Sequence, residues 1–249
     1  MRPGPAGGPG GRSDAKETTG GQRRDQELHG AAFFDLDGTL LARSSVFALA
    51  KPLRDAGVLR SVTVARGLAA QALHFRTGGR GGARERVLGA ALRGVEVDRL
   101  HAVLDSCVEH TLAPLICQGV TRLLRSHREA GRSLYLVSSA PEEVVTRVAS
   151  MLGVASVLAT QLQSIDGVYT GHVSTFCQGD AKADAIRHAA EAAGIDLASS
   201  YAYADSISDL AMLETVGHPL AVNPDRELAR EAHRRGWEIL RLLPPAARK

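Results

Sequence analysis

Two carboxylates one residue apart, Asp35 and Asp37, follow the apolar run Ala31–Phe34 and precede Gly38 and Thr39. The run is short and ends close to a glycine, which favours a buried strand over a helix. Residues i and i+2 of a strand point the same way, so both carboxylates should project together where the sheet ends. Neighbouring carboxylates repel each other unless one is protonated or a cation lies between them. The pair therefore predicts a site for a hard divalent cation with oxygen ligands.

A second acidic pair stands far along the chain. Tyr201–Ala204 predicts a strand, Asp205 follows it directly, and Asp209 comes four residues later. One helical turn would bring Asp209 back beside Asp205. Ligands of open α/β sheets bind at the carboxyl ends of the strands, so we expect the two acidic pairs to share one edge of the sheet. The alternative is that Asp205 caps a helix and Asp209 is solvated.

Ser138 and Lys182 add a hydroxyl and a cation to this pattern. Ser138 follows the expected strand Ser133–Val137 and precedes a helix that starts near Pro141, a junction that can hold an anion or simply cap the helix. Lys182 stands at the start of a helix that ends at Gly194. Lysine occurs at only four positions, while arginine supplies the other cations, so we interpret Lys182 as a point charge for a phosphate or a carboxylate. A solvated lysine is the alternative.

These motifs together resemble the haloacid dehalogenase superfamily, and within it the phosphoserine-phosphatase-like subgroup. The motifs that carry the resemblance are, in chain order, Asp35-Leu-Asp37-Gly-Thr39, Val137-Ser138, Lys182 and Asp205-Ser-Ile-Ser-Asp209. The resemblance spans about residues 31–242. Phosphoserine phosphatases proper carry a glutamate nine residues after the nucleophile, where this chain has Ser44, and their fourth motif is richer in glycine. The resemblance therefore implies the phosphoryl chemistry but not L-phosphoserine as the substrate.

The resemblance implies a role for each acidic residue. Asp35 would attack phosphorus and form an aspartyl-phosphate. Asp37 would protonate the leaving alcohol and then deprotonate the hydrolytic water. Mg²⁺ would be bound by Asp35, Asp205 and the main-chain carbonyl of Asp37, with Asp209 supporting it directly or through a neighbouring group.

The phosphate-binding groups implied by the resemblance are neutral or cationic: Thr39, Ser138 and Lys182. The substrate would be a small phosphorylated metabolite, bound without nucleic acid or membrane. Arg84 and Arg86 are weaker candidates for substrate contact, and a surface role is the alternative for both.

The elements that must position these residues form an α/β fold, with a Rossmann-like, mostly parallel sheet. Between the first strand and the second, the periodicity is helical only. The expected helices are Leu40–Leu53, Val62–Phe75, Ala83–Leu92 and Val97–Leu115. Because a parallel sheet normally resumes after one crossover helix, we expect an inserted helical cap at 44–115 within a core of 30–43 and 116–249. The cap would act as a lid that reads the substrate, and a structural appendage is the alternative.

The second half of the chain continues the α/β pattern. Gly119–Ala130 predicts a helix, Val154–Leu162 a strand, and Asp166-Gly167 the turn of a hairpin. Further on we expect a strand at 220–224, a helix at 227–235 and an edge strand at 237–242.

The composition limits the possible partners and the cellular location of the protein. The chain has 249 residues, and its net charge of +3 is too small to argue for nucleic acid. No apolar run approaches the roughly 20 residues that span a bilayer. Three cysteines without CxxC spacing indicate a reducing compartment and no zinc site, so we expect a cytoplasmic protein. Residues 1–29 are polar and glycine-rich, which predicts a disordered tail rather than a secretory signal. The sequence does not indicate an oligomeric state.

Other functions compete with hydrolysis. A phosphotransferase would use the same chemistry with an acceptor alcohol in place of water. A non-enzymatic phospho-acceptor module would also suit a strand-end aspartate, but it has no use for the leaving-group acid Asp37. A dinucleotide-binding enzyme would need a GxGxxG motif after a strand, and the sequence has none. A purely structural protein would not gather so many acids at strand ends.

Overall fold

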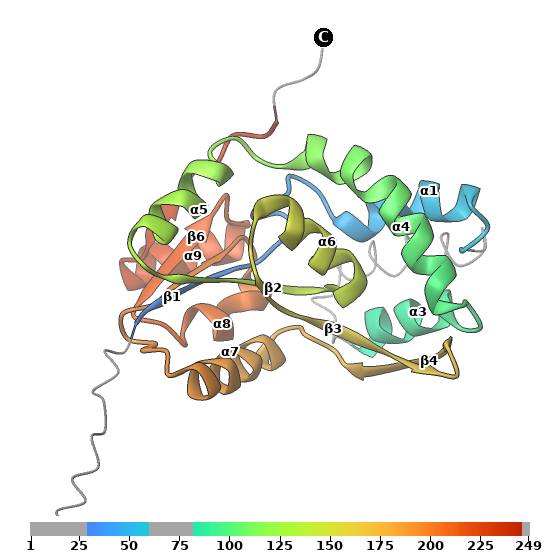
Figure 1. Cartoon of the computed structure of the whole chain (residues 1–249). Helices are drawn as coiled ribbons and strands as arrows, with labels where there is room; N and C mark the ends of the chain where they lie inside the picture. Colours follow the sequence, from blue (N-terminus) through green and yellow to red (C-terminus); the bar gives the residue numbers. More distant parts are fainter. Residues whose placement is uncertain (1–28, 60–81, 246–249) are drawn as a thin grey trace, which may run out of the picture.

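The computed structural model describes residues 29–59 and 82–245 and confirms the α/β fold. The strands of this part form one sheet in the order β4-β3-β2-β1-β5-β6-β7 (Figure 1). Their bounds are β1 Ala31–Phe34, β2 Ser133–Pro141, β3 Ser156–Ile165, β4 Val168–Thr175, β5 Tyr201–Ala204, β6 His218–Val222 and β7 Glu238–Leu240. Neighbouring strands are parallel except β3 and β4, which form the expected hairpin. Both turn residues, Asp166 and Gly167, have the positive φ that such tight turns require.

Helices cover the sheet and fill the region between β1 and β2. Their bounds are α1 Ser45–Asp55, α3 Gly82–Leu92, α4 Val97–Leu112, α5 Val120–Glu129, α6 Glu142–Leu152, α7 Asp180–Ala193, α8 Leu210–Leu213 and α9 Arg226–Arg235, with 3-10 turns η1 Ala113–Leu115 and η2 Ile207–Asp209. The helix expected at 62–75 and the tail 1–28 lie outside the described residues. No helix in the described ranges is long and apolar enough to cross a membrane.

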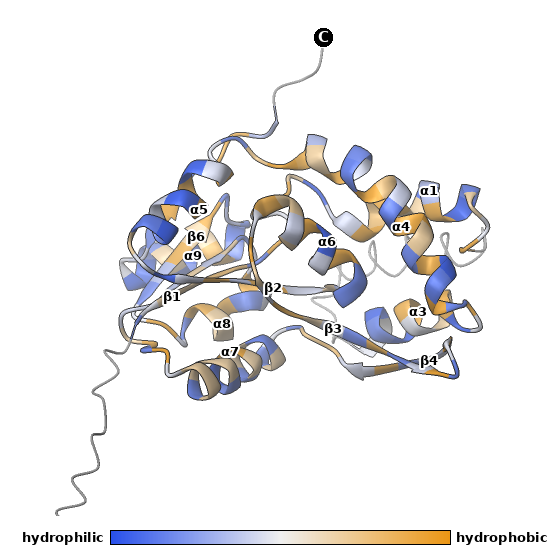
Figure 2. Ribbon diagram, viewed as in Figure 1, coloured by the Kyte–Doolittle hydropathy of each residue, from blue (hydrophilic) through white to orange (hydrophobic). Residues whose placement is uncertain are grey.

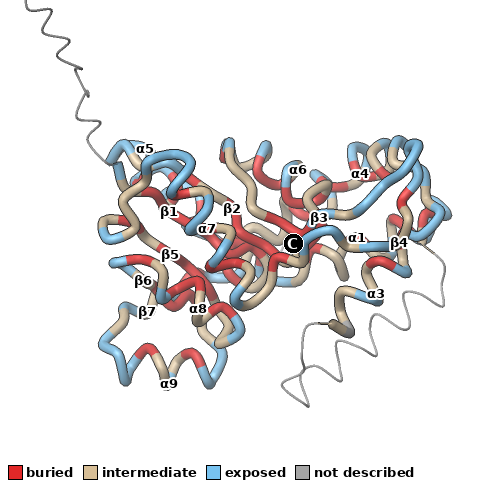
Figure 3. The backbone as a smooth tube through the Cα atoms, turned by 90° about the horizontal axis from the view of Figure 1, so that it is seen from below, coloured by how far each residue is buried: buried red, intermediate tan, exposed pale blue. Residues whose placement is uncertain are grey.

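The central strand β1 separates two apolar cores. Ala32 and Phe34 pack on one face, with α5, α6 and the helices between β1 and β2. Ala31 and Phe33 pack on the other face, with α7, α8 and α9. All four residues are fully buried, as expected for a strand covered on both sides (Figure 3). Figure 2 shows apolar residues along the inner strands and polar residues on the outer helix surfaces.

The strand register explains why distant residues meet. Phe34 pairs with Leu136 of β2 on one side and with Tyr203 of β5 on the other. The residues that follow, Asp35 and Asp205 among them, therefore leave the sheet at the same edge. The chain runs outward from β1 in one direction and from β5 in the other, so this edge is the topological switch point, the usual ligand site of such sheets.

Two boundaries differ from the sequence-based expectation. The helix expected from Leu40 begins only at Ser45, because residues 36–41 form a tight loop in which the N–H groups of Leu40 and Leu41 both donate to the carbonyl of Leu36. The strand expected to end at Val137 continues to Pro141 through an irregularity in its pairing with β3. Ser138 therefore lies inside β2 and not at the first turn of the next helix.

Main-chain hydrogen bonds tie the helices between β1 and β2 to the rest of the described structure at two places. The segments that enter and leave this region run side by side, with Ala42 N–H donating to Leu115 and Cys117 N–H donating to Leu40, both at 2.9 Å. The linker between α3 and α4 also pairs with β4: Gly94 donates to the carbonyl of Tyr169, and Tyr169 N–H donates to Val95.

Candidate active site

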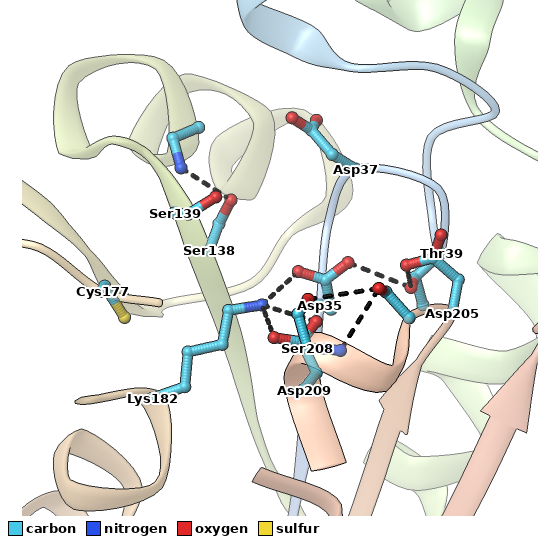
Figure 4. A network of polar contacts seen from close by, with 12 residues as sticks. Asp35, Asp37, Thr39, Ser138, Ser139, Cys177, Lys182, Asp205, Ser208 and Asp209 are labelled. Atoms are coloured by element: carbon cyan, nitrogen blue, oxygen red, sulfur yellow. Dashed lines mark hydrogen bonds and ion pairs between the residues drawn. The ribbon is translucent and has the colours of Figure 1, made fainter. Parts of the chain in front are cut away.

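Three carboxylates converge at the switch point of the sheet. One oxygen from each of Asp35, Asp205 and Asp209 lies within 4.8 Å of the others (Figure 4). Asp35 follows β1, Asp205 follows β5, and Asp209 closes the 3-10 turn η2. Asp35 and Asp209 are buried, and Asp205 is partly exposed. The two acidic pairs of the sequence thus supply three members of one cluster.

Lys182 supplies the positive charge of this cluster. Its Nζ lies 2.5 Å from Oδ1 of Asp35 and 3.0 Å from the carboxylate of Asp209. The side chain rises from the first turn of α7 and is almost completely buried (Figure 4). Burial alone would lower the pKa of this ammonium group, but the two carboxylates outweigh it and raise the pKa above its usual value. Lys182 is therefore a permanent cation held against the predicted nucleophile.

Thr39 and Gly38 shape the loop that carries Asp35. The Thr39 hydroxyl lies 3.1 Å from Oδ2 of Asp35 and 3.3 Å from Oδ1 of Asp205, so it shares its proton between them. Gly38 has φ +93°, and a Cβ atom there would stand 2.1 Å from Oδ2 of Asp205. Only glycine lets the loop pass this close to the second carboxylate.

The acidic cluster is suited to a divalent cation. Burial, with the charges of Asp35 and Asp209, raises the pKa of Asp205 to about 8. Burial and Asp35 raise the pKa of Asp209 to about 6, while Lys182 acts in the opposite direction. One ammonium group does not compensate three carboxylates, and their oxygen atoms are the ligand type that Mg²⁺ prefers. The residues present therefore fit a magnesium site.

The carboxylate of Asp37 stands apart from this cluster (Figure 4). Its Oδ1 accepts a hydrogen bond of 2.8 Å from the N–H of Ser45, and its Oδ2 accepts one of 3.1 Å from the Ser44 hydroxyl. Burial is the main cause that raises the pKa of Asp37, to about 6. The side chain is therefore held by α1 and the residue before it, away from the three clustered carboxylates.

Ser138 lies on β2 and does not join the carboxylate network. Its hydroxyl oxygen accepts a hydrogen bond of 3.1 Å from the N–H of Ala140, and the side chain is buried. Because the oxygen is the acceptor in this contact, its proton can be donated to another group. Arg84, from α3, is close enough to lower the pKa of Asp209, and Arg86 is exposed on the same helix.

Residues 32–214 match the family of haloacid dehalogenase-like hydrolases. This chain belongs to that family. The match runs from β1 through α8 and so contains every residue of the acidic cluster as well as Lys182. The chain is accordingly a hydrolase of the haloacid dehalogenase type.

The relatives of this hydrolase include proteins named as phosphatases. A probable phosphatase of Mycobacterium tuberculosis is 38% identical over 220 residues, which cover 87% of this chain and 77% of that protein. A phosphoserine phosphatase of the same species is 34% identical over 230 residues, covering 89% and 74%. A solved structure of a Bordetella pertussis protein of unknown function superposes with a TM-score of 0.76 at 27% identity, covering 86% of this chain and 98% of that one.

Three residues in or beside this hydrolase's site, Ser45, Asp225 and Cys177, were not among the site residues predicted from the sequence. The N–H of Ser45 and its bond to Asp37 carry no sequence signal, because any residue has such a group. Asp225 holds the loop after β5 by donating its N–H to the carbonyl of Asp205 at 2.7 Å, and it also caps α9; the cap position before the helix was the available signal. Cys177 is buried near Lys182, and burial raises the pKa of its thiol to about 11, so it is not a nucleophile.

Proposed function

We propose that this hydrolase is a Mg²⁺-dependent phosphatase that hydrolyses a small phosphorylated metabolite through an aspartyl-phosphate on Asp35. The observation that carries the proposal is the convergence of Asp35, Asp205 and Asp209 within 4.8 Å, with Lys182 bound to two of them. A buried cluster of this composition is costly for a structural protein, because unpaired buried charges destabilise the fold. It is useful where two anions, a carboxylate and a phosphate, must meet.

The proposed roles follow from the contacts of each side chain. Asp35 is the nucleophile, since its carboxylate is oriented from two sides by Lys182 and by the Thr39 hydroxyl. As the phosphate enters, Lys182 and Thr39 share their hydrogen bonds with its oxygens. Ser138 contributes its free hydroxyl proton from the neighbouring strand.

Asp37 is the proposed general acid and base. Its separate position keeps it off the cation site, and its raised pKa of about 6 lets it carry a proton near neutral pH. It gives this proton to the leaving alcohol and later removes one from the attacking water. Ser44 and Ser45 hold the carboxylate in place between these two steps.

Asp35, Asp205, Asp209 and the main-chain carbonyl of Asp37 are the proposed holders of Mg²⁺. When bound, the ion supplies charge neutralisation between the nucleophile and the phosphate.

The helices between β1 and β2 are the proposed cap, residues 44–115, and residues 30–43 and 116–249 the proposed core. The adjacent linkers at Ala42 and Leu115 support these boundaries, because the chain leaves and re-enters the core at one point. The tail 1–29 has no proposed role. The absence of disulfides among the three cysteines supports a reducing compartment such as the cytoplasm.

The test is hydrolysis of an aryl phosphate, 4-nitrophenyl phosphate, by pure protein with Mg²⁺. We expect activity that chelation abolishes and that Asp35→Asn reduces to background. Asp98→Asn, the same change at an exposed position on α4, is the matched control and should retain full activity. Retained activity in a folded Asp35→Asn protein would refute the assignment of Asp35 as the nucleophile.

The same preparation separates the competing activities. Transfer of phosphate to added alcohols, detected as new phosphate esters, would indicate a phosphotransferase. A phosphorylated protein that accumulates without turnover would indicate a phospho-acceptor module.

A further inference from the structure

A small apolar cavity lies between α1, α3, α4 and the start of α6. Its volume is about 60 Å³, and no polar atom forms part of its surface. Its walls include Val46, Leu49, Leu88, Ala91, Leu100 and Pro141. An engineered apolar cavity of about 150 Å³ holds benzene, so this one has room for about two or three carbon atoms.

The cavity adjoins two segments that contact the proposed catalytic groups, the start of α1 and the end of β2. Val46 follows Ser45, whose N–H donates to Asp37. Pro141 follows Ala140, whose N–H donates to Ser138. If Asp37 protonates the leaving alcohol, the alcohol's carbon atoms leave the site on the side of Ser45, and the next residue, Val46, lines the cavity.

The one charged residue in the cavity wall, Glu143, contributes carbon atoms and not its carboxylate. Its Oε1 accepts a hydrogen bond of 2.6 Å from the hydroxyl of Tyr169 on β4. Its Oε2 is buried and finds no donor in the described part of the chain. The carboxylate of Glu143 behind this apolar wall disfavours a substrate that carries a carboxylate, because like charges repel strongly through a medium of low polarity.

We propose that this cavity receives the carbon skeleton of the substrate, so that the preferred substrates are phosphate monoesters of short, uncharged aliphatic alcohols. The proposal rests on the proposed phosphatase function and specifies its substrate class. Amino-acid phosphates and sugar phosphates are disfavoured, since their carboxylate or hydroxyl groups would lose water without finding partners in this apolar wall. Ser44, where phosphoserine phosphatases proper have glutamate, leaves no carboxylate at that position for an amino group.

The first test compares methyl, ethyl, propyl and butyl phosphate with O-phosphoserine, measured as kcat/KM with Mg²⁺. Each methylene that enters an apolar site should raise kcat/KM about fourfold until the cavity is full, near propyl or butyl. Phosphoserine should fall below propyl phosphate, which has the same number of carbon atoms. Equal kcat/KM along the series, or faster turnover of phosphoserine, would overturn the proposal.

The second test changes the cavity. Ala91→Leu fills it and should remove the chain-length gain, so that propyl phosphate is hydrolysed no faster than methyl phosphate. Leu88→Ala enlarges it and should move the optimum to longer alcohols. Ala90→Leu, the same substitution as the filling variant at the exposed neighbouring position of α3, should leave the profile unchanged. An unaltered profile in the folded Leu88→Ala protein would contradict the assignment even if Ala91→Leu does not fold.

A binding measurement separates this proposal from the phosphatase function. The Kd of the matching alkylphosphonates, measured by calorimetry, should fall about fourfold per methylene in the original protein and stay flat in Ala91→Leu. If no phosphate ester is hydrolysed, the phosphatase function is wrong. If esters are hydrolysed and the phosphonate Kd does not depend on chain length, only the substrate class is wrong.

Discussion

The Nζ of Lys182 lies 2.5 Å from Oδ1 of Asp35, and both side chains are almost completely withdrawn from solvent. A second carboxylate, that of Asp209, lies 3.0 Å from the same ammonium group. The lysine therefore offsets part of the charge of the acidic cluster before any ligand arrives. Stability and the proposed function are linked at this residue, because the same charge that orients the proposed nucleophile also offsets the cost of burying the carboxylates.

Replacing Lys182 by alanine should lower the free energy of unfolding by about 3 kcal/mol at pH 7 without added metal, because removal of one partner leaves buried charges uncompensated. Urea unfolding measures this change. Lys51→Ala is the matched control: its side chain is 76% exposed and pairs with Asp55, so the loss should stay below about 1 kcal/mol. Equal losses in the two variants would show that Lys182 does not compensate the cluster.

Asp37→Asn should slow turnover by about 10²–10⁴-fold, because the amide cannot donate the proton that the leaving alcohol needs. Binding of a phosphate analogue such as tungstate should survive, since the carboxylate of Asp37 lies outside the cluster around Lys182. Steady-state kinetics and calorimetry on one preparation test both parts. Loss of tungstate binding in a protein with unchanged unfolding behaviour would place Asp37 in the phosphate site instead.

Gly38→Ala should abolish activity, because its Cβ would stand 2.1 Å from Oδ2 of Asp205 and displace that carboxylate. Gly131 is the matched control: it has φ +72° against +93°, but nothing lies within 4 Å of a Cβ atom there. Both substitutions should cost about 1–2 kcal/mol of backbone strain. Hydrolysis of 4-nitrophenyl phosphate should be lost only at position 38, and parallel losses at both positions would contradict the close approach to Asp205.

The elements that carry the site were predictable because each has a strong local signal. The run Ala31–Phe34 is apolar throughout, as expected for a central parallel strand. The Asp166-Gly167 pair is typical of a tight turn and indicates the hairpin of β3 and β4 directly. The proximity of Asp35, Asp205 and Asp209 was predictable from a general property of parallel sheets: the carboxyl ends of their strands share one edge.

What the sequence did not reveal depends on contacts between distant segments. The periodicity predicts a helix from Leu40 because Leu40 and Leu41 suit either a helix or a loop. The loop is selected by Gly38, whose N–H donates to Leu41, and by the pairing of Leu41 with Ile116. Strand periodicity, continued past the end of β1, predicts that the carboxylates of Asp35 and Asp37 project together. The strand ends at Phe34, so that periodicity no longer applies there.

Gly89→Ala should destabilise the protein by about 1–3 kcal/mol, although alanine is normally the better helix residue. The reason is that a Cβ at Gly89 of α3 would stand 2.1 Å from the carbonyl oxygen of Gly171 on β4. Gly82→Ala, at the start of the same helix, is the control, because its nearest neighbour is 3.6 Å away, so it should be neutral or stabilising. A stabilised Gly89→Ala protein, measured by urea unfolding, would mean that α3 does not pack closely on the β3–β4 hairpin.

His127 should make the protein less stable in mild acid. Its Nε2 lies 2.7 Å from the hydroxyl of Tyr203, whose ring stacks on Phe34, and its Nδ1 is buried without a partner in the described residues. Burial, with a smaller contribution from Arg132, lowers the pKa of His127 to about 4, against 6.5 for an exposed histidine. The unfolded chain therefore takes up a proton below pH 6.5 that the folded protein refuses until about pH 4.

This difference should lower the free energy of unfolding by about 2 kcal/mol between pH 7 and pH 5, and the loss should level off below pH 4. Asp205 and Asp209 titrate in a similar range with the opposite sign, because their raised pKa values make the folded protein bind protons first. The measurement is therefore the difference between the original protein and His127→Gln, which cannot titrate, in urea unfolding at each pH. The original protein should lose stability relative to His127→Gln as the pH falls from 7 to 5. A difference that is constant across this range would mean that His127 takes up its proton in the folded state as readily as in the unfolded chain.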